Sequence, residues 1–260
     1  MRLPGRRVPD ANRVRHRGMN SDIRSPYRYN GGKGSSGVVQ TIINQIPPHQ
    51  TYIEAFVGGG AVFRAKAPAA SSILIDRDPA VVDEWKRRCE FTSVPVTILQ
   101  ADALERLPCL VLANPECFVY LDPPYVHATR RDINLYRYEM DDDAHRRLLH
   151  LLETLSCPWA LSGYRSAMYD EAARLNGWRR VDYRRMGRRG PVVESLWVNY
   201  PAPSTIAETT FAGSGFRERE RIKRKVMRWA AKFEALSAIE QQAIFSRLAS
   251  ICTNGGAGLP

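Results

Sequence analysis

The sequence has little that would bind a metal, form disulfides or enter a membrane. Its 260 residues include five Cys, and none forms a Cys-x-x-Cys pair, so neither a zinc site nor a disulfide framework is indicated. No apolar run approaches the roughly 18 residues of a membrane span, and the basic N-terminus has no apolar signal core. These absences predict a cytoplasmic protein with reduced cysteines, no bound metal and no membrane association.

A phosphate-binding loop is also missing, although the chain has a run of glycines. The segment Gly58-Gly59-Gly60 does not continue as Gly-x-Gly-x-x-Gly, because position 63 is Phe. No Gly-Lys-Ser/Thr follows it either, so a P-loop is excluded. Glycines after a strand still let a ligand approach the backbone closely. The run therefore favours a nucleoside ligand without phosphates.

Positive charge is present in excess. The chain carries 38 Lys and Arg against 27 Asp and Glu, a formal net charge of +11, and all but six of the cations are Arg. This balance favours a polyanionic partner, and the planar fork of Arg suits phosphates and guanine edges. A GC-rich genome explains the preference for Arg equally well, but the net charge remains under either explanation.

Composition and periodicity divide the chain into four segments. Residues 1–24 read as a flexible basic tail, 25–200 as the catalytic domain, 201–215 as a linker and 216–252 as a helical hairpin. Within the second segment, short apolar runs alternate with helical patterns. The expected strands are Thr51–Phe56, Ile73–Asp76, Val96–Gln100, Cys117–Leu121, Trp159–Ser162, Arg180–Arg185 and Val193–Asn199.

This alternation predicts an α/β layer fold with a mostly parallel sheet. The clearest helix should begin near Asp141–Asp143, since acidic residues suit a helix N-terminus and an apolar stripe from Leu148 to Leu155 follows. The last two strands are joined by Met186–Pro191, which is too short for a crossover helix, so they should form an antiparallel hairpin.

The tetrapeptide Asp122-Pro123-Pro124-Tyr125 directly follows the buried strand Cys117–Leu121. It places a carboxylate, a rigid backbone bend and an aromatic ring at one sheet edge. The carboxylate can accept hydrogen bonds from an amine, the prolines lack N–H donors, and the ring can stack. The tetrapeptide therefore suits a flat ring that carries an exocyclic amine.

Two other segments suit a nucleoside ligand. Asp76 ends a strand about twenty residues after the first, where an acid can hold a ribose diol, as in dinucleotide-binding folds. Upstream, Tyr29-Asn30-Gly31-Gly32-Lys33 could fold over a ligand or form an ordinary turn.

Taken together, Tyr-x-Gly-Gly-Lys, Phe-x-Gly-Gly-Gly, a strand-end Asp and Asp-Pro-Pro-Tyr occur in one order. This order resembles the N6-adenine-specific DNA methyltransferases of the D12 type, the class typified by the bacterial DNA adenine methyltransferase. The resemblance covers about residues 25–200, and the ending Glu194–Tyr200 is similar to phage and prophage members. It implies a Rossmann-like class I methyltransferase fold with a seven-stranded sheet, and S-adenosylmethionine as the methyl donor.

The resemblance also implies roles for individual residues. The donor would be contacted by Tyr29, Lys33, Phe56, Gly58, Gly60, Asp76 and Asp102. For Asp102 a second role is open, because an Asp at a strand end is also a common helix cap. Asp122 and the Pro123 carbonyl would accept hydrogen bonds from the N6 amine, with Pro124 shaping the bend. Tyr125 would stack on an adenine flipped out of double-stranded DNA.

The loop after this motif interleaves charge and rings. Contact with DNA is expected from Arg130, Arg131, Tyr136, Arg137 and Tyr138, although a solvated loop is the alternative. Only about sixty residues separate Phe63 from Asp122, which leaves no room for the separate recognition domain of better-known family members. The resemblance therefore does not extend to a target sequence.

Other functions stay open at this level. Methylation of N4 of cytosine, or of RNA, uses the same amine chemistry, but the more usual cytosine motif begins with Ser where this chain has Asp122. A DNA-binding protein with a relict donor site is an alternative of a different class. The oligomeric state is also left open, between a monomer and a weak dimer.

Overall fold

The computed structural model describes Lys33 and residues 37–89, 94–130, 136–187, 190–213 and 215–254. The chain divides into two compact units, Met1–Glu208 and Thr209–Pro260, and each is considered by itself. The expected tail 1–24, Tyr29 and Arg131 lie outside the described residues. The division after Glu208 falls within the segment that the sequence marks as a linker.

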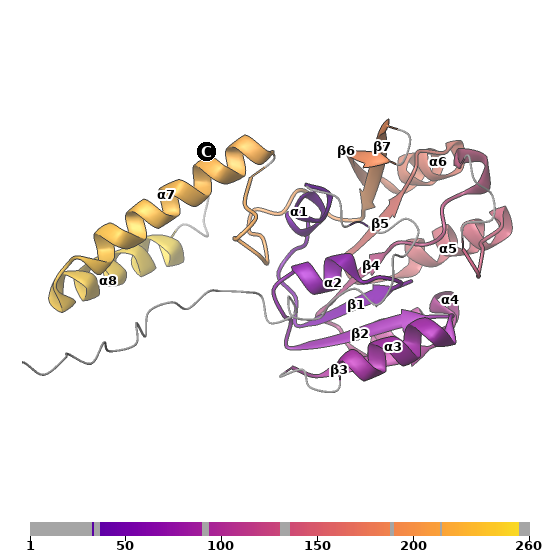
Figure 1. The fold of residues 1–260 in the computed structure, drawn as a ribbon, viewed down its shortest axis with the longest axis horizontal. Coiled ribbons are helices and arrows are strands. Elements are labelled where there is room, and N and C mark those ends of the chain that lie inside the picture. Colours follow the sequence, from indigo (N-terminus) through magenta and orange to yellow (C-terminus); the bar gives the residue numbers. More distant parts are fainter. Residues whose placement is uncertain are drawn as a thin grey trace, which may run out of the picture. The chain divides into compact units, whose positions relative to one another are not determined.

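A seven-stranded sheet forms the centre of the first unit (Figure 1). Its strands are β1 Thr51–Ala55, β2 Ser71–Asp76, β3 Val96–Gln100, β4 Cys117–Leu121, β5 Trp159–Gly163, β6 Arg179–Gly187 and β7 Gly190–Val198. The order is β3-β2-β1-β4-β5-β7-β6. Strands β1 to β5 pair in parallel, whereas β7 is antiparallel to both β5 and β6. The predicted fold class is confirmed.

The hairpin is longer than the sequence suggested. Strand β6 continues to Gly187 and β7 already begins at Gly190, with these two glycines opposite each other. The expected connection Met186–Pro191 is therefore mostly strand. Backbone pairing along the hairpin extends the strands into this Gly- and Arg-rich segment, whose composition resembles a loop.

Helices cover both faces of the sheet. They are α1 Val38–Ile43, α2 Ala61–Ala65, α3 Pro79–Cys89, α4 Ala103–Ala113, α5 Asp142–Thr154 and α6 Ala167–Asn176, with a short 3₁₀ helix at His127–Thr129. Helix α5 begins where the acidic residues predicted it, because the Asp141 carboxylate accepts a hydrogen bond from the Ala144 amide at 2.7 Å. Its residues Leu148, Leu149 and Leu152 are buried.

Successive side chains of a strand point to opposite faces, so the sheet has two different interiors. On one face, Ile53, Val119 and Leu161 join a large apolar cluster with residues of α4, α5 and α6. On the other face, Tyr52 stacks with Phe118 and Phe63, and Phe63 meets Trp85 of α3 edge-on.

This second face also carries polar side chains near the carboxyl end of the sheet. Glu54, Tyr120 and Ser162 adjoin residues of the apolar cluster along their strands, and Tyr183 and Glu194 are paired with each other across β6 and β7. The Tyr120 and Ser162 hydroxyls are 2.9 Å apart, and Glu54 accepts hydrogen bonds from the Tyr52 hydroxyl at 2.7 Å and the Phe63 amide at 3.0 Å. Buried polar groups are thus concentrated on one face of the sheet.

The second unit consists of α7 Phe216–Glu234 and α8 Ala238–Asn254. Between them, Gln241 donates hydrogen bonds to the carbonyls of Phe233 and Leu236 at 3.1 and 3.0 Å, which satisfies groups left over at the end of α7. Within the part of the chain that the structure describes, no helix combines the length and apolar composition needed to cross a membrane.

Candidate active site

The sheet has a switch point between β1 and β4. From β1 the order continues to β2 and β3 on one side, and from β4 to β5 on the other. In open α/β sheets, ligands bind at the carboxyl ends of strands at such a point. Ala55 pairs with Leu121, so the two strands end level with each other. The residues that follow, Phe56 and Asp122, are therefore neighbours at this edge.

A cleft opens at the same edge. It is lined by Phe56, Asp76, Arg77, Asp78, Asp122, Pro124, Tyr136, Arg137, Tyr138 and Met140. Two residues predicted to bind the donor and two residues of the acceptor motif thus share one cleft with three aromatic or basic residues of the following loop. Lys33, Gly58, Gly60, Asp102, Pro123, Tyr125 and Arg130 are not among the residues lining it.

The turn after β1 has an unusual backbone. Phe56 has a φ of 63°, and Gly58 and Gly60 have φ values of 44° and 56°. A positive φ at a non-glycine residue costs of the order of 1 kcal/mol and is typical of functional sites. At Gly60 an added Cβ would lie 2.4 Å from Cζ2 of Trp85, so this glycine is required by close packing. Trp85 also donates to the Gly58 carbonyl at 2.9 Å.

Asp76 connects this turn to β2. One carboxylate oxygen accepts from the Gly58 amide at 2.8 Å and the other from the Asp78 amide at 2.9 Å. Burial raises the pKa of Asp76 above its ordinary value, and these backbone hydrogen bonds oppose the rise. Each carboxylate oxygen has a second lone pair, which suits a ligand that donates two hydroxyl hydrogens.

Asp102 has a structural contact of its own. It is the N-cap of α4 and accepts a hydrogen bond from the Leu104 amide at 2.8 Å. Its other oxygen lies 3.6 Å from the Arg77 guanidinium, and Arg77 is the residue of this pair that reaches the cleft. Asp102 is therefore a helix cap, the alternative that the sequence had left open. Its contact with a donor stays a prediction.

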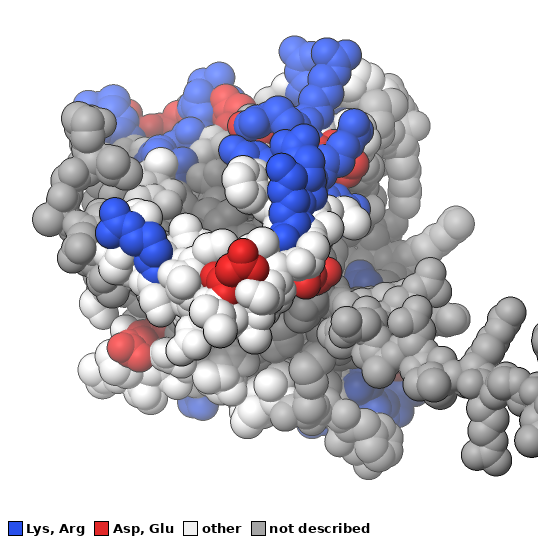
Figure 2. Space-filling model, turned by 90° about the vertical axis from the view of Figure 1, so that its left-hand side faces the viewer, with Lys and Arg blue, Asp and Glu red and all other residues white. Residues whose placement is uncertain are grey.

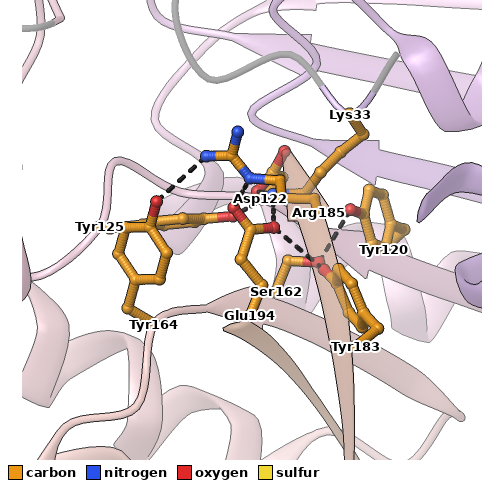
Figure 3. A network of polar contacts seen from close by, with 9 residues as sticks. All are labelled: Lys33, Tyr120, Asp122, Tyr125, Ser162, Tyr164, Tyr183, Arg185 and Glu194. Carbon is orange, nitrogen blue, oxygen red and sulfur yellow. Dashed lines mark hydrogen bonds and ion pairs between the residues drawn. The ribbon is translucent and has the colours of Figure 1, made fainter. Parts of the chain in front are cut away.

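The acceptor motif is held from behind by Lys33. The Lys33 ammonium lies 2.8 Å from Oδ1 of Asp122 and also donates to the Tyr125 hydroxyl (Figure 3). Burial raises the pKa of Asp122, and the positive charge of Lys33 opposes that rise. In the structure the Lys33 ammonium contacts Asp122, Tyr125 and Glu194, and the contact of Lys33 with the donor that the sequence predicted stays a prediction.

Tyr125 is enclosed. Its exposed fraction is 6%, the Tyr164 ring meets it edge-on at 4.8 Å, and the Lys33 ammonium lies 4.7 Å from its ring centre. The stacking of a base on Tyr125 therefore stays a prediction. Pro123 is buried, whereas Pro124 reaches the cleft.

The loop after the motif contains two kinds of residue. The Arg130 side chain is 3% exposed and binds both oxygens of Glu139, at 3.1 and 2.6 Å. In this arrangement its guanidinium holds the loop together and does not face solvent. Arg137, by contrast, is 67% exposed and lines the cleft together with Tyr136 and Tyr138. Burial raises the pKa of Tyr136 to about 12, so its phenol is neutral.

A polar cluster next to Asp122 was not predicted from the sequence. The cluster consists of Glu194, Arg185, Tyr183, Tyr164, Tyr120 and Ser162, which Figure 3 shows around Lys33 and Asp122. One signal was available. Glu194 is a charged residue at the start of the buried run Glu194–Val198, where a carboxylate needs a buried partner. Among the described residues, no group of His, Cys, Asp and Glu could hold a metal ion.

Comparison with known families gives one match. Residues 108–183 match the model of the D12 class N6 adenine-specific DNA methyltransferase family. The match spans less than a third of the chain, but it includes strand β4, the Asp-Pro-Pro-Tyr motif, strand β5 and helix α6. The fold is a Rossmann-like α/β fold with a mostly parallel sheet, and this segment resembles the D12 class in particular. No curated protein sequence matches the chain.

Solved structures with a similar fold were also found. M. capricolum TrmK in complex with S-adenosyl-homocysteine is 7% identical, with a TM-score of 0.42 over 84% of this chain and 96% of that one. The N-terminal domain of human METTL16 in complex with the same molecule is 12% identical, with a TM-score of 0.41 over 59% and 63%. At TM-scores below 0.5 these similarities carry no argument about function.

Proposed function

We propose that the protein is an S-adenosylmethionine-dependent methyltransferase that methylates the exocyclic N6 amine of adenine in DNA. One observation carries the proposal most directly. A single cleft at the switch point of the sheet is lined by Phe56 and Asp76 from the donor segments and by Asp122 and Pro124 from the acceptor motif. A methyl transfer needs both ligands at one place, and the chain supplies residues suited to each.

The acceptor side fits an aromatic amine. The lone pair of such an amine is delocalised into its ring, which makes it a poor nucleophile. A carboxylate such as Asp122 can accept a hydrogen bond from the amine and favour the geometry in which the lone pair is free. The effect is mainly one of positioning and electrostatics, and it requires an ionised Asp122.

The donor side fits a nucleoside. Asp76 presents a carboxylate beside the strained turn at Phe56, where the backbone is held by Gly58 and Trp85. The donor, when bound, supplies an electrophilic methyl group on a sulfonium. Phe56 and Asp76 would hold it, the first by apolar contact and the second through its ribose hydroxyls.

DNA as the substrate is supported by the family match and by charge. Helix α7 alone has eight Lys and Arg against three Glu. Arg217, Arg221, Arg224, Arg228 and Lys232 recur every three or four residues, so they share one side of the helix, and all of them are exposed. Figure 2 shows Lys and Arg side chains gathered on the face it presents. Such a stripe suits contact with phosphates.

The test is to incubate the purified chain with isotope-labelled S-adenosylmethionine and either double-stranded DNA or RNA, and to identify the modified nucleoside by mass spectrometry. N6-methyladenine in DNA is the expected product. N4-methylcytosine without N6-methyladenine, or modification of RNA alone, would contradict the proposal. Absence of donor binding by calorimetry would favour a DNA-binding protein with a relict site.

A further inference from the structure

Glu194 is a buried carboxylate at the edge of the acceptor motif. It lies on β7 with an exposed fraction of 0%, and the residues that share its face of this strand, Leu196 and Val198, are apolar and equally buried. Burying an ionised group costs several kcal/mol unless it is well paired. The sheet alone does not require a charge at this position, so its partners have to explain it.

Two cations and a phenol surround this carboxylate. Lys33 lies 3.2 Å from Oε2, Arg185 of β6 pairs with Oε1, and the Tyr183 hydroxyl donates to Oε2 at 3.3 Å. Burial disfavours the charged form, but Lys33 and Arg185 overcome this effect and hold the pKa of Glu194 below its ordinary value. Glu194 is therefore ionised at neutral pH.

Lys33 is shared between two carboxylates. Its ammonium lies 2.8 Å from Asp122 and 3.2 Å from Glu194, an arrangement visible in Figure 3. The Lys33 side chain is 2% exposed, whereas that of Asp122 is 22% exposed and lines the cleft. Lys33 thus contacts Asp122 from the buried side and influences how the carboxylate faces the cleft.

Sharing the ammonium changes what Asp122 can do. A lysine paired with Asp122 alone would draw electron density from the carboxylate and weaken its hydrogen bond to an amine. Glu194 competes for the same ammonium, and Arg185 neutralises the charge that Glu194 adds. The two cations and the two carboxylates of this group balance in charge. The charge of Glu194 thus bears on how much of the Lys33 charge acts on Asp122.

We propose that Glu194 is a positioning residue for methyl transfer, which together with Arg185 holds Lys33 so that Asp122 stays directed at the cleft as a strong hydrogen-bond acceptor. The proposal rests on the proposed function, because Asp122 is taken as the group that contacts the acceptor amine. It assigns a role to the strand hairpin β6–β7, which supplies both Glu194 and Arg185.

Other titratable groups also face Asp122. Tyr120, Tyr125 and Tyr183 are phenols whose pKa values burial raises above the ordinary value, and Tyr136 behaves in the same way. Burial also raises the pKa of the Tyr52 phenol. The carboxyl group of Glu54 differs from these phenols because it titrates closer to neutral pH, since burial raises its pKa to about 8. A titration of Asp122 below about pH 7 therefore avoids changes in these groups.

The experiment compares three variants of the full chain. Glu194→Gln removes the charge and keeps the shape, and Arg185→Gln removes the cation on the other side of Glu194. Asp182→Asn is the matched control, since Asp182 lies on the same hairpin but is exposed and bonds Ser195 and Arg180 at 2.6 and 3.0 Å. Carboxyl-carbon NMR, assigned with Asp122→Asn, follows the titration of Asp122 without donor or DNA.

The two charge changes should act with opposite sign. In Glu194→Gln the midpoint for Asp122 should fall, because a neighbouring negative charge is lost, and in Arg185→Gln it should rise. The single-turnover rate at saturating donor and DNA should fall about tenfold or more in Glu194→Gln, with its acid limb moved to lower pH. Asp182→Asn should change neither the titration nor the rate.

The role of Glu194 is overturned if a folded Glu194→Gln chain leaves either the titration of Asp122 or the rate unchanged. If Glu194→Gln does not fold, Arg185→Gln serves as the test, since Arg185 is partly exposed. An unchanged titration midpoint of Asp122 in Arg185→Gln then overturns the proposal. An inactive wild-type chain would instead refute the proposed function, while opposite shifts in the two variants would still support the control of Asp122 by Glu194.

Discussion

The basic residues beside the acceptor motif and those of helix α7 have different surroundings. At the sheet edge, Lys33 and Arg130 are 2% and 3% exposed and bind carboxylates directly. On α7, Arg221 is 67% exposed and reaches Glu218 only at 3.5 Å. Buried, paired cations fix the position of neighbouring groups, whereas exposed ones supply attraction that salt screens. Residues of one type can therefore determine geometry in one unit and affinity in the other.

The largest effect should come from removing the acceptor carboxylate. Asp122→Ala should reduce methyl transfer by at least about 10³-fold, because the amine loses its hydrogen-bond acceptor, while donor affinity changes less than about threefold. Single-turnover rates and calorimetry measure the two. Asp143→Ala, at a side chain 76% exposed, is the control. A rate for Asp122→Ala close to that of the wild type would mean that the buried cations around Asp122 do not position a group needed for methyl transfer.

The second-largest effect is expected on the stability of the first unit, from a change in its packing. Gly60→Ala places a Cβ 2.4 Å from Trp85 at a φ of +56° and should cost about 2–4 kcal/mol of the free energy of unfolding. Gly177 has a similar φ, +67°, but nothing lies within 4 Å of its added Cβ, so Gly177→Ala should cost about 1 kcal/mol. Urea unfolding compares them, and equal losses would show that contact with Trp85 is unimportant.

A buried acid behind the donor turn should respond to pH. Burial raises the pKa of Glu54 to about 8, above its unfolded value, so the folded state binds the extra proton and stability falls as pH rises between the two values. Glu54→Gln mimics the neutral form and can keep both hydrogen bonds to Oε2. The variant should match the wild type near pH 5 and exceed it by about 1–3 kcal/mol near pH 7.5.

Thermal unfolding across this range measures the difference in stability. A Glu54→Gln chain that is less stable than the wild type at every pH would indicate that Glu54 is ionised and needed as a charge. That outcome would extend the pattern of paired, buried charges to the donor side of the cleft.

The smallest effect is expected on α7. Replacing Arg224 and Arg228 by Gln should weaken DNA binding roughly three- to tenfold and reduce the slope of log K against log salt by about 1.8, as for two lost phosphate contacts. The control replaces Arg219 and Lys223, which lie on other sides of the helix. Equal slopes for both pairs would mean that net charge matters and the stripe does not.

The sequence predicted the fold well because its signals are local. The run Cys117–Leu121 coincides with β4, whose residues are all buried, since buried strands of a parallel sheet read as continuous apolar segments. The run Val96–Gln100 coincides with the edge strand β3. Asp122 and Asp76 were recognisable because the first follows a strand and the second ends one. Both lie at the cleft, as residues at the carboxyl ends of β4 and β2, the parallel strands on either side of β1, should.

The contacts of Lys33, Arg130 and Glu194 could not be predicted in the same way. Each depends on pairing between residues distant in sequence or on a loop that turns back on itself. Charge composition suggested that Arg130 contacts DNA, and it gave no sign that the Arg130 guanidinium pairs with Glu139, nine residues later. The polarity of Glu194 was visible in the sequence, yet its partner, Lys33, precedes the first helix.

The link from Lys33 to Glu194 has a consequence for how the protein is made. Lys33 precedes α1 and Glu194 lies in the last strand of the sheet, so nearly the whole unit must be synthesised before the acceptor motif obtains its full set of partners. Domains generally fold as units during synthesis. A growing chain that has completed β5 but not the hairpin β6–β7 would carry the Lys33–Asp122 pair without Glu194 and Arg185, and competence for the reaction would arise only as the final hairpin joins the sheet.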